Sequence, residues 1–255
     1  MPKCIRKKIR ATRHLFIKHL EILTDIFVGM VKIGVILPTT SKDRQWEKPE
    51  YSYLFKFFQS FKKTCCKEHT YVFYIAYDAD DPFYIEHNGF FKTLGFDIKF
   101  YISQEEKGWV TKLWNILAKL AYDDGCEYIY QCGDDILFLQ KGWVNESIAV
   151  LKKNNNIGIT GPLTVNNLVI LTQVMVHRTH LDIFGYFFPE EIKNWYCDDW
   201  INAMYPKTWL KSKYACSNSG GKERYSIFRE GKEKLFEIAQ RDVQKVADWK
   251  KLKFK

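Results

Sequence analysis

The chain has 255 residues, which is enough to bury a full core. With 46% hydrophobic and 27% charged residues, it is too apolar for a disordered protein and too charged for a membrane protein. Its 39 basic residues outnumber 30 acidic ones, and the net charge of +9 favours anionic partners such as nucleotides, nucleic acid or an acidic membrane surface. The excess lies at the two ends, and no basic stripe runs through the middle, which argues against nucleic-acid binding.

Residues 1–30 predict a basic, amphipathic helix that packs on the domain or makes a peripheral membrane contact. Glu21 and Asp25 interrupt its apolar run and no small-residue cleavage site follows, so we expect no signal peptide. No stretch approaches the roughly 18–20 apolar residues of a transmembrane segment. The 7 cysteines are odd in number and form no Cys-x-x-Cys pair, which indicates a reducing, cytoplasmic setting rather than disulfides or a zinc site.

In the first half of the chain, short apolar runs alternate with amphipathic stretches. The runs predict strands over 33–38, 71–76, 96–102 and 127–132. The amphipathic stretches predict helices that begin near Pro49 and cover 82–92 and 109–122. This alternation predicts an α/β, Rossmann-like fold with a mostly parallel central sheet and helices on both faces.

The second half is less regular. We expect a short strand over 158–161, an apolar strand over 169–176 and a flexible loop over 216–224. A helix over about 230–249 closes the chain. No repeat or linker divides the sequence, so we expect one domain.

Polar residues stand where three of the predicted strands end. Thr39 and Thr40 follow the first strand, Asp78 follows the second, and Asp134 and Asp135 follow the fourth. Ligands of open parallel sheets bind at the carboxyl ends of the strands. These side chains are therefore expected to meet at one binding site.

The Asp134–Asp135 pair is the main candidate for chemistry. Two adjacent carboxylates after a buried strand repel each other unless a cation neutralises them. Mg²⁺ and Mn²⁺ prefer oxygen ligands and often take one or two carboxylates together with substrate phosphates. The alternative is a solvated turn, because Gly-Asp-Asp is also favourable turn chemistry.

Two further groups of residues are candidates. Asp198 and Asp199 stand between aromatic residues, where burial can raise a carboxylate pKa towards that of a useful base, although a helix N-terminus explains them as well. Lys112 and Asn115 lie one turn apart on the helix that precedes the Asp134–Asp135 pair, so they can reach one ligand together.

In order and spacing, these motifs resemble those of GT-A fold glycosyltransferases, and the chain is similar to glycosyltransferase-like proteins of large DNA viruses and protists. The resemblance spans about residues 32–225. It rests on the segments Val35–Thr40, Tyr77–Pro82, Lys112–Asn115, Tyr128–Ile136 and Phe184–Trp200. It implies a glycosyltransferase domain over 31–228, which stands between the basic, amphipathic helix expected over 1–30 and a C-terminal helix expected over 229–255 and packed on that domain.

The resemblance implies a nucleotide-sugar donor, with a UDP-sugar expected. Thr39, Thr40 and Asp78 would contact the nucleoside, and Asp135 would ligate Mn²⁺ or Mg²⁺ through the diphosphate. Asp134 would contact the ribose or the metal. One departure is that Gly133 stands where the usual Asp-x-Asp motif has its first acid.

The resemblance also implies an inverting reaction with Asp199 as the base. Asp199 would take the proton of an acceptor hydroxyl, on a glycan or another acceptor, while Asp198 would hold the acceptor or orient a helix. A second departure is that no histidine follows His180 to serve as the late metal ligand of many GT-A enzymes.

Three alternatives remain open. A retaining reaction is one of them. A sugar nucleotidyltransferase normally needs a Gly-rich loop after the first strand, and residues 39–44 contain no glycine. A non-catalytic nucleotide-sugar or glycan-binding protein on a degenerate GT-A fold would also fit the two departures.

Overall fold

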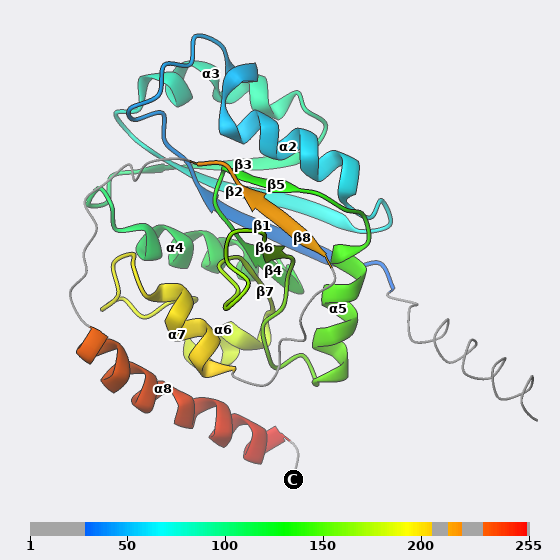
Figure 1. Cartoon of the computed structure of the whole chain (residues 1–255), viewed down its shortest axis with the longest axis vertical. Helices are drawn as coiled ribbons and strands as arrows, with labels where there is room; N and C mark the ends of the chain where they lie inside the picture. The colour runs from blue at the N-terminus through cyan, green and yellow to red at the C-terminus, as the bar shows by residue number, and fades with distance from the viewer. Residues whose placement is uncertain (1–28, 206–213, 221–231, 254–255) are drawn as a thin grey trace, which may run out of the picture.

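The computed structural model describes residues 29–205, 214–220 and 232–253 (Figure 1). The predicted N-terminal helix falls in residues 1–28 and so lies outside the described residues. Among the helices that are described, none combines the length and the apolar character that a membrane crossing requires.

The centre of the molecule is a five-stranded sheet with the order β3-β2-β1-β4-β7. Four parallel strands, β1 (Lys32–Pro38), β2 (Thr70–Asp78), β3 (Asp97–Ser103) and β4 (Tyr128–Gln131), form most of it. β7 (Val174–His177) joins β4 in the antiparallel direction. The predicted strands and the mostly parallel sheet are confirmed.

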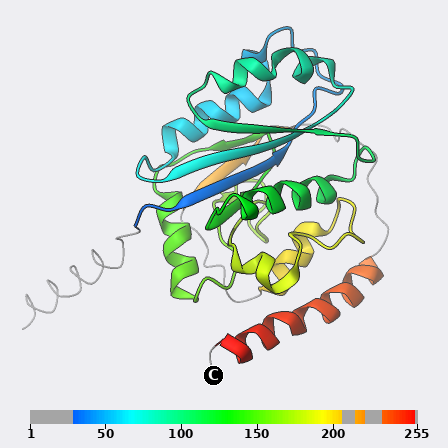
Figure 2. The same ribbon diagram turned by 180° about the vertical axis from the view of Figure 1, so that it is seen from behind.

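Helices cover both faces of the sheet, as predicted (Figures 1 and 2). α2 (Tyr53–Thr64), preceded by the short 3₁₀ turn η1 (Pro49–Tyr51), and α3 (Pro82–Lys92) cover one face. The apolar side of α5 (Trp143–Lys153) joins the same hydrophobic cluster. Phenylalanines that recur along α2 at helical spacing fill this cluster.

The opposite face carries α4 (Val110–Asp123), α6 (Thr179–Phe184) and α7 (Cys197–Met204), with α8 (Lys232–Lys253) packed outside them. α4 lies close against β1, because a Cβ atom on Gly34 would come within 2.8 Å of the Ala121 Cβ atom. The predicted helices over 82–92, 109–122 and 230–249 are confirmed within a few residues.

Three predictions for the second half differ from the structure in part or in full. Residues 158–161 make only an isolated bridge, from Thr160 to Met175. The strand predicted over 169–176 begins at Val174, and Val169 is 78% exposed. The expected loop over 216–224 begins with a strand, β8.

β8 (Ala215–Asn218) lies between β5 (Ile136–Phe138) and β6 (Leu163–Thr164) in a second, three-stranded sheet. Its partners come from segments more than 50 positions earlier in the chain, at Ile136–Phe138 and Leu163–Thr164. The polar sequence of β8 carries no signal of its own for a strand, because cross-strand pairing and burial decide short strands.

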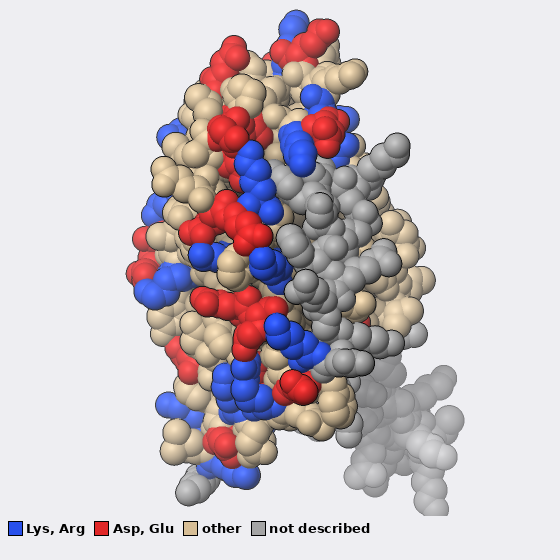
Figure 3. All heavy atoms as spheres, turned by 90° about the vertical axis from the view of Figure 1, so that its left-hand side faces the viewer, with Lys and Arg blue, Asp and Glu red and all other residues tan. Residues whose placement is uncertain are grey.

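The cysteines within the described ranges are all free: Cys65, Cys66, Cys126, Cys132, Cys197 and Cys216. Acidic and basic side chains are interspersed on the face shown in Figure 3. Ion pairs join some acidic and basic side chains of the protein, such as Lys107 to Asp80 at 2.6 Å and Lys193 to Glu106 at 2.8 Å.

A buried carboxylate fixes α8 to the rest of the molecule. The Asp242 side chain has no exposed surface and lies 3.0 Å from the Arg241 guanidinium and 2.9 Å from the Lys245 ammonium. The Tyr186 hydroxyl donates a hydrogen bond of 2.8 Å to the same carboxylate. Because Tyr186 follows α6, this cluster ties α8 to the helical layer below it.

We expect Asp242→Ala to lower the free energy of unfolding by about 2 kcal/mol, because it removes hydrogen bonds to a buried charge. Burial raises the pKa of Asp242, but its hydrogen bonds from Arg241, Lys245 and Tyr186 outweigh burial and lower the pKa overall. The stabilisation is therefore present at neutral pH and is lost as the pH falls below roughly 4.

Urea unfolding at pH 7 and at acidic pH measures both effects. Asp248→Ala is the matched control, because Asp248 lies on the same helix with 59% of its side chain exposed. The control should stay within about 0.5 kcal/mol of the unchanged protein. Equal losses from the two variants would contradict the role of Asp242.

Candidate functional site

A cavity of about 110 Å³ lies at the carboxyl ends of the three parallel strands β1, β2 and β3. Thr39 and Thr40 line it after β1, Asp78 at the end of β2, and Ser103 at the end of β3. The predicted convergence of Thr39, Thr40 and Asp78 is confirmed. Ser103 was not among the predicted residues, although it ends a strand in the same way.

Asp81 holds the loop that forms one wall of this cavity. Its carboxylate accepts hydrogen bonds of 2.7 Å from both the Ser41 backbone N–H and the Ser41 hydroxyl. It also caps α3 by accepting from the Tyr84 N–H at 3.2 Å. Asp81 is therefore a capping residue, and it couples the loop after β1 to α3.

Asp134 is fully buried behind this cavity. Its Oδ2 atom accepts a 2.6 Å hydrogen bond from the Thr39 hydroxyl, and that hydroxyl lies 2.7 Å from the Tyr84 hydroxyl. The bond spans 95 positions in the chain and joins the residues that follow β1 and β4. Asp134 thus lies directly behind a side chain that forms the cavity wall.

Asp135 is 9% exposed and has a glycine packed on each side of its carboxylate. A Cβ atom on Gly220 would lie 1.6 Å from Asp135 Oδ2, and one on Gly133 would lie 2.7 Å from Oδ1. The Ser219 N–H and hydroxyl donate to the Asp135 carbonyl at 3.1 and 3.2 Å. Only glycines allow the backbone to approach the carboxylate this closely.

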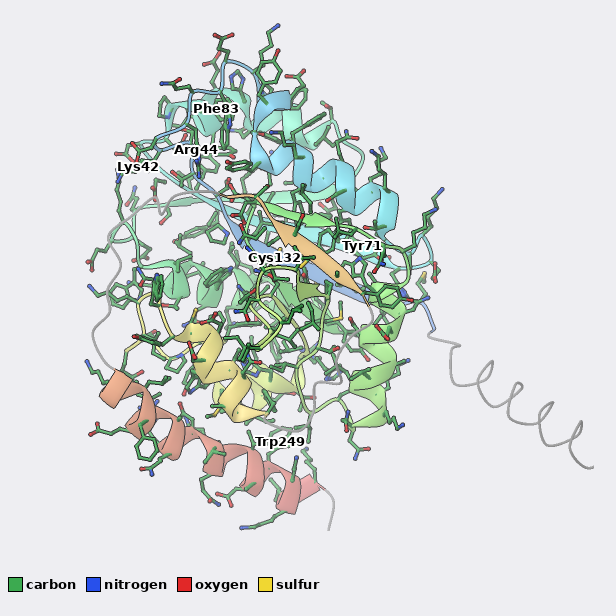
Figure 4. All side chains as sticks on the ribbon, viewed as in Figure 1. Lys42, Arg44, Tyr71, Phe83, Cys132 and Trp249 are labelled. Atoms are coloured by element: carbon green, nitrogen blue, oxygen red, sulfur yellow. The ribbon has the colours of Figure 1, made fainter. Side chains whose placement is uncertain are left out.

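Arg44 brings a positive charge to this region. Its Nη2 atom donates a 2.7 Å hydrogen bond to the Gly220 carbonyl, and its guanidinium lies 4.8 Å from the centroid of the Tyr53 ring. Figure 4 labels Arg44, in the loop after β1, and Cys132, where β4 ends. Neither Arg44 nor Gly220 was predicted. Gly220 could not be predicted from the sequence, because its importance depends on the fold, which packs it against Asp135.

The residues present fit a hard divalent cation bound together with a phosphate. Within residues 29–205, 214–220 and 232–253, no group of three His, Cys, Asp or Glu side chains is placed to hold a metal. One or two carboxylates plus substrate phosphate oxygens are, however, a usual ligand set for Mg²⁺. Asp135, with Asp134 beside it, would supply the oxygen ligands of such a set.

A second, larger cavity of about 660 Å³ lies on the α4 and α7 side of the sheet. Val110 lines both cavities, so the two adjoin at the start of α4. Asp198 and Asp199 line the larger one, as do Gln131 and Asn218. Neither Asp134 nor Asp135 lines this cavity, but the Asp135 carbonyl accepts a hydrogen bond from Ser219, the residue after Asn218 in its wall.

Asp198 and Asp199 form the first turn of α7, as one of the two sequence interpretations proposed. Asp198 is partly buried, and Asp199 is exposed. Burial and the negative charge of Asp199 raise the pKa of Asp198 to about 6. Tyr196 precedes the helix in the left-handed conformation, at φ 73°, and gives it no side-chain cap.

The structure does not bring Lys112 and Asn115 to either cavity wall. The Asn115 amide bonds the backbone of Phe187 and Phe188 at 2.8–3.0 Å. Lys112 pairs with Glu105 at 2.6 Å. Both therefore position neighbouring segments, which contradicts the expectation that they reach one ligand together; their helical spacing was right, but their partners come from elsewhere in the chain.

Known structures share this fold at low sequence identity. One is TarS 1–349 from S. aureus in complex with UDP, with a TM-score of 0.57, 14% identity, and coverage of 83% of this chain and 64% of TarS 1–349. Another is the mannosyltransferase PcManGT from Pyrobaculum calidifontis in complex with GDP-Man and Mn²⁺, with a TM-score of 0.58, 11% identity, and coverage of 80% and 59%. The chain thus spans about three fifths of the length of both.

A cytidylyltransferase from Leptospira borgpetersenii is similar as well, with a TM-score of 0.50, 9% identity, and coverage of 72% of this chain and 77% of that one. No protein-family model matches the sequence, and no curated protein matches it. The GT-A fold is therefore confirmed by structure alone. The expected similarity to viral proteins stays a prediction.

We expect the Asp198 carboxyl to titrate near pH 6 and to shift towards its ordinary value of about 4 in Asp199→Asn, because that change removes a like charge. The folded form binds this proton more tightly than the unfolded chain. Its contribution to stability is therefore present below about pH 4 and is lost as the pH rises through about 6.

Carbon-detected NMR of ¹³C-labelled aspartate carboxyls, compared between the unchanged protein and Asp198→Asn for assignment, measures the midpoint. A midpoint near 4 in the unchanged protein would contradict the environment described for Asp198.

Proposed function

We propose that this protein is a metal-dependent glycosyltransferase that moves a sugar from a nucleotide-sugar donor, with a UDP-sugar expected, to an acceptor hydroxyl. One observation carries the proposal: two adjoining cavities lie at this end of the sheet, and a buried pair of carboxylate residues bonds to the segments that line them, Asp134 to Thr39 in one wall and Asp135 to Ser219 beside the other. One cavity suits the nucleoside of a donor. The other contains a second acidic pair suited to an acceptor.

On the donor side, Thr39, Thr40 and Asp78 would contact the nucleoside. Asp134 holds Thr39 in place and would contact the ribose or the metal, and Asp135 would ligate Mn²⁺ or Mg²⁺ together with the diphosphate. The bound metal would offset the negative charge that develops on the leaving diphosphate. The PcManGT structure in complex with GDP-Man and Mn²⁺ supports this arrangement by analogy of fold.

On the acceptor side, Asp199 would take the proton of the acceptor hydroxyl as its oxygen attacks the anomeric carbon. A bond forms between that oxygen and the anomeric carbon, the bond from the anomeric carbon to the diphosphate oxygen breaks, and the nucleoside diphosphate leaves. Attack from the face opposite the leaving group would invert the anomer. Asp198 would hold the acceptor, and its pKa is raised by burial and by the negative charge of Asp199.

A thermal-shift screen of nucleotide sugars, with and without Mn²⁺, tests the proposal most directly. We expect one nucleotide sugar to raise the melting temperature by several degrees in Mn²⁺, because a ligand that binds the folded state stabilises it. Stabilisation by a nucleoside triphosphate, but by no nucleotide sugar, would contradict the proposal and favour nucleotidyl transfer.

Two variants locate the metal within that experiment. Asp135→Ala should abolish the Mn²⁺-dependent part of the thermal shift. Gly220→Ala should lower the donor affinity in Mn²⁺ by about tenfold, because the added Cβ atom would displace the Asp135 carboxylate. Gly89→Ala is the matched control, since nothing lies within 4 Å of the Cβ that it adds. An unchanged Mn²⁺ response in Asp135→Ala would rule out Asp135 as the ligand.

We expect Asp199→Asn to bind the donor normally and to turn over at least about 100-fold more slowly, because it removes the base and leaves the donor cavity intact. Calorimetry of donor binding and a transfer assay measure the two properties. Asp198→Asn is the comparison variant. Near-normal turnover in Asp199→Asn, with a large loss in Asp198→Asn, would move the base to Asp198.

A further inference from the structure

Gln131 is an unusual residue for its place in the sheet. It is the last residue of β4, pairs with Ile36 on one side and Val174 on the other, and is only 3% exposed. Alternation along the strand puts it on the same face as Ile129, the face that α4 and α7 cover. An apolar residue is expected at such a position.

The Gln131 amide lines the larger cavity and makes no hydrogen bond to any side chain or backbone group of the described residues. Its atoms are not among the fully enclosed polar atoms that lack a partner in the described part of the chain, so the amide is reached from the cavity that it lines. Its donor and acceptor are therefore available to a molecule in the cavity. Asp198 and Asp199 line the same cavity, so that molecule would lie beside the proposed base.

The rest of the wall combines aromatic rings with neutral amides. Trp114 and Phe188 lie with their rings 5.5 Å apart, and Trp195 keeps 44% of its surface exposed. Asn167 and Asn194 add amide groups. Large aromatic faces beside a few hydrogen-bonding groups match a sugar ring, which has an apolar C–H face and a rim of hydroxyls.

The charge of the cavity wall restricts the chemical class of the ligand further. Among the described residues that line this cavity, the only charged side chains are the carboxylates of Asp198 and Asp199. No lysine or arginine of that set would hold a phosphate, sulfate or carboxylate group, and the two acids would repel one. A neutral hydroxylated ligand meets no such penalty.

We propose that the larger cavity binds a neutral saccharide as the acceptor and that Gln131 is one of its specificity-determining contacts. The role of the saccharide as an acceptor rests on the proposed transferase function. The saccharide-binding site itself does not. Gln131 hydrogen-bonds ring hydroxyls, the indole of Trp195 packs against the sugar face, and the attacking hydroxyl points to the Asp198–Asp199 pair. The cavity of about 660 Å³ has room for more than one sugar ring.

Saturation-transfer NMR without donor tests the site, using neutral methyl glycosides of glucose, galactose, mannose, xylose and N-acetylglucosamine, the disaccharides lactose and cellobiose, and methyl glucuronide as the anionic counterpart. At least one neutral saccharide should bind, and methyl glucuronide should bind at least about tenfold more weakly. Gln131→Leu, which keeps the volume but removes the amide, should weaken the bound neutral saccharide by about tenfold.

Gln244→Leu, on the outer helix α8, is the control and should leave binding unchanged. Equal melting temperatures of the two variants would exclude a folding defect. Preferential binding of methyl glucuronide, failure of every neutral saccharide, or unchanged affinity in Gln131→Leu would overturn the proposal. If saccharides bind as expected but no nucleotide sugar stabilises the protein, the transferase function fails while the saccharide site stands.

Discussion

The hydrogen bond between the Thr39 hydroxyl and the buried Asp134 carboxylate is the contact on which the rest of the site depends. It joins the ends of β1 and β4, two neighbouring parallel strands that are 95 positions apart in the chain at this contact. It fixes one wall of the smaller cavity and the backbone that presents Asp135. A buried carboxylate needs such partners, because an unpaired charge in the interior is strongly disfavoured.

The two acidic pairs lie in different environments, and this difference supports the different roles proposed for them. Asp134 and Asp135 are buried, enclosed by hydroxyls and by the backbone of two glycines, which suits binding of a cation with a phosphate. Asp198 and Asp199 begin a helix at the edge of a large cavity, where the pKa of Asp198 is raised to about 6. A carboxylate with a raised pKa can hold a proton at mildly acidic pH and donate a hydrogen bond to a ligand.

Sequence patterns predicted the first half of the fold well and the second half poorly. The strands β1, β2 and β4 are short apolar runs that are buried on both faces, and their own residues indicate this burial. β8 is a polar segment, Ala215–Asn218, that is a strand only because β5 and β6 lie on either side of it. In the same way, helical spacing placed Lys112 and Asn115 on one surface but could not reveal that distant backbone groups already engage Asn115.

The sequence by itself determined the parallel sheet, the convergence of Thr39, Thr40 and Asp78, and the two acidic pairs, because periodicity and strand ends are local properties. Only the tertiary structure decided that Gly220 packs on Asp135, that Arg44 reaches the Gly220 carbonyl, and that the Gln131 amide lines a cavity beside Asp198. Those contacts join segments far apart in the chain. Their existence depends on how the layers pack, and no local pattern of residue types records that packing.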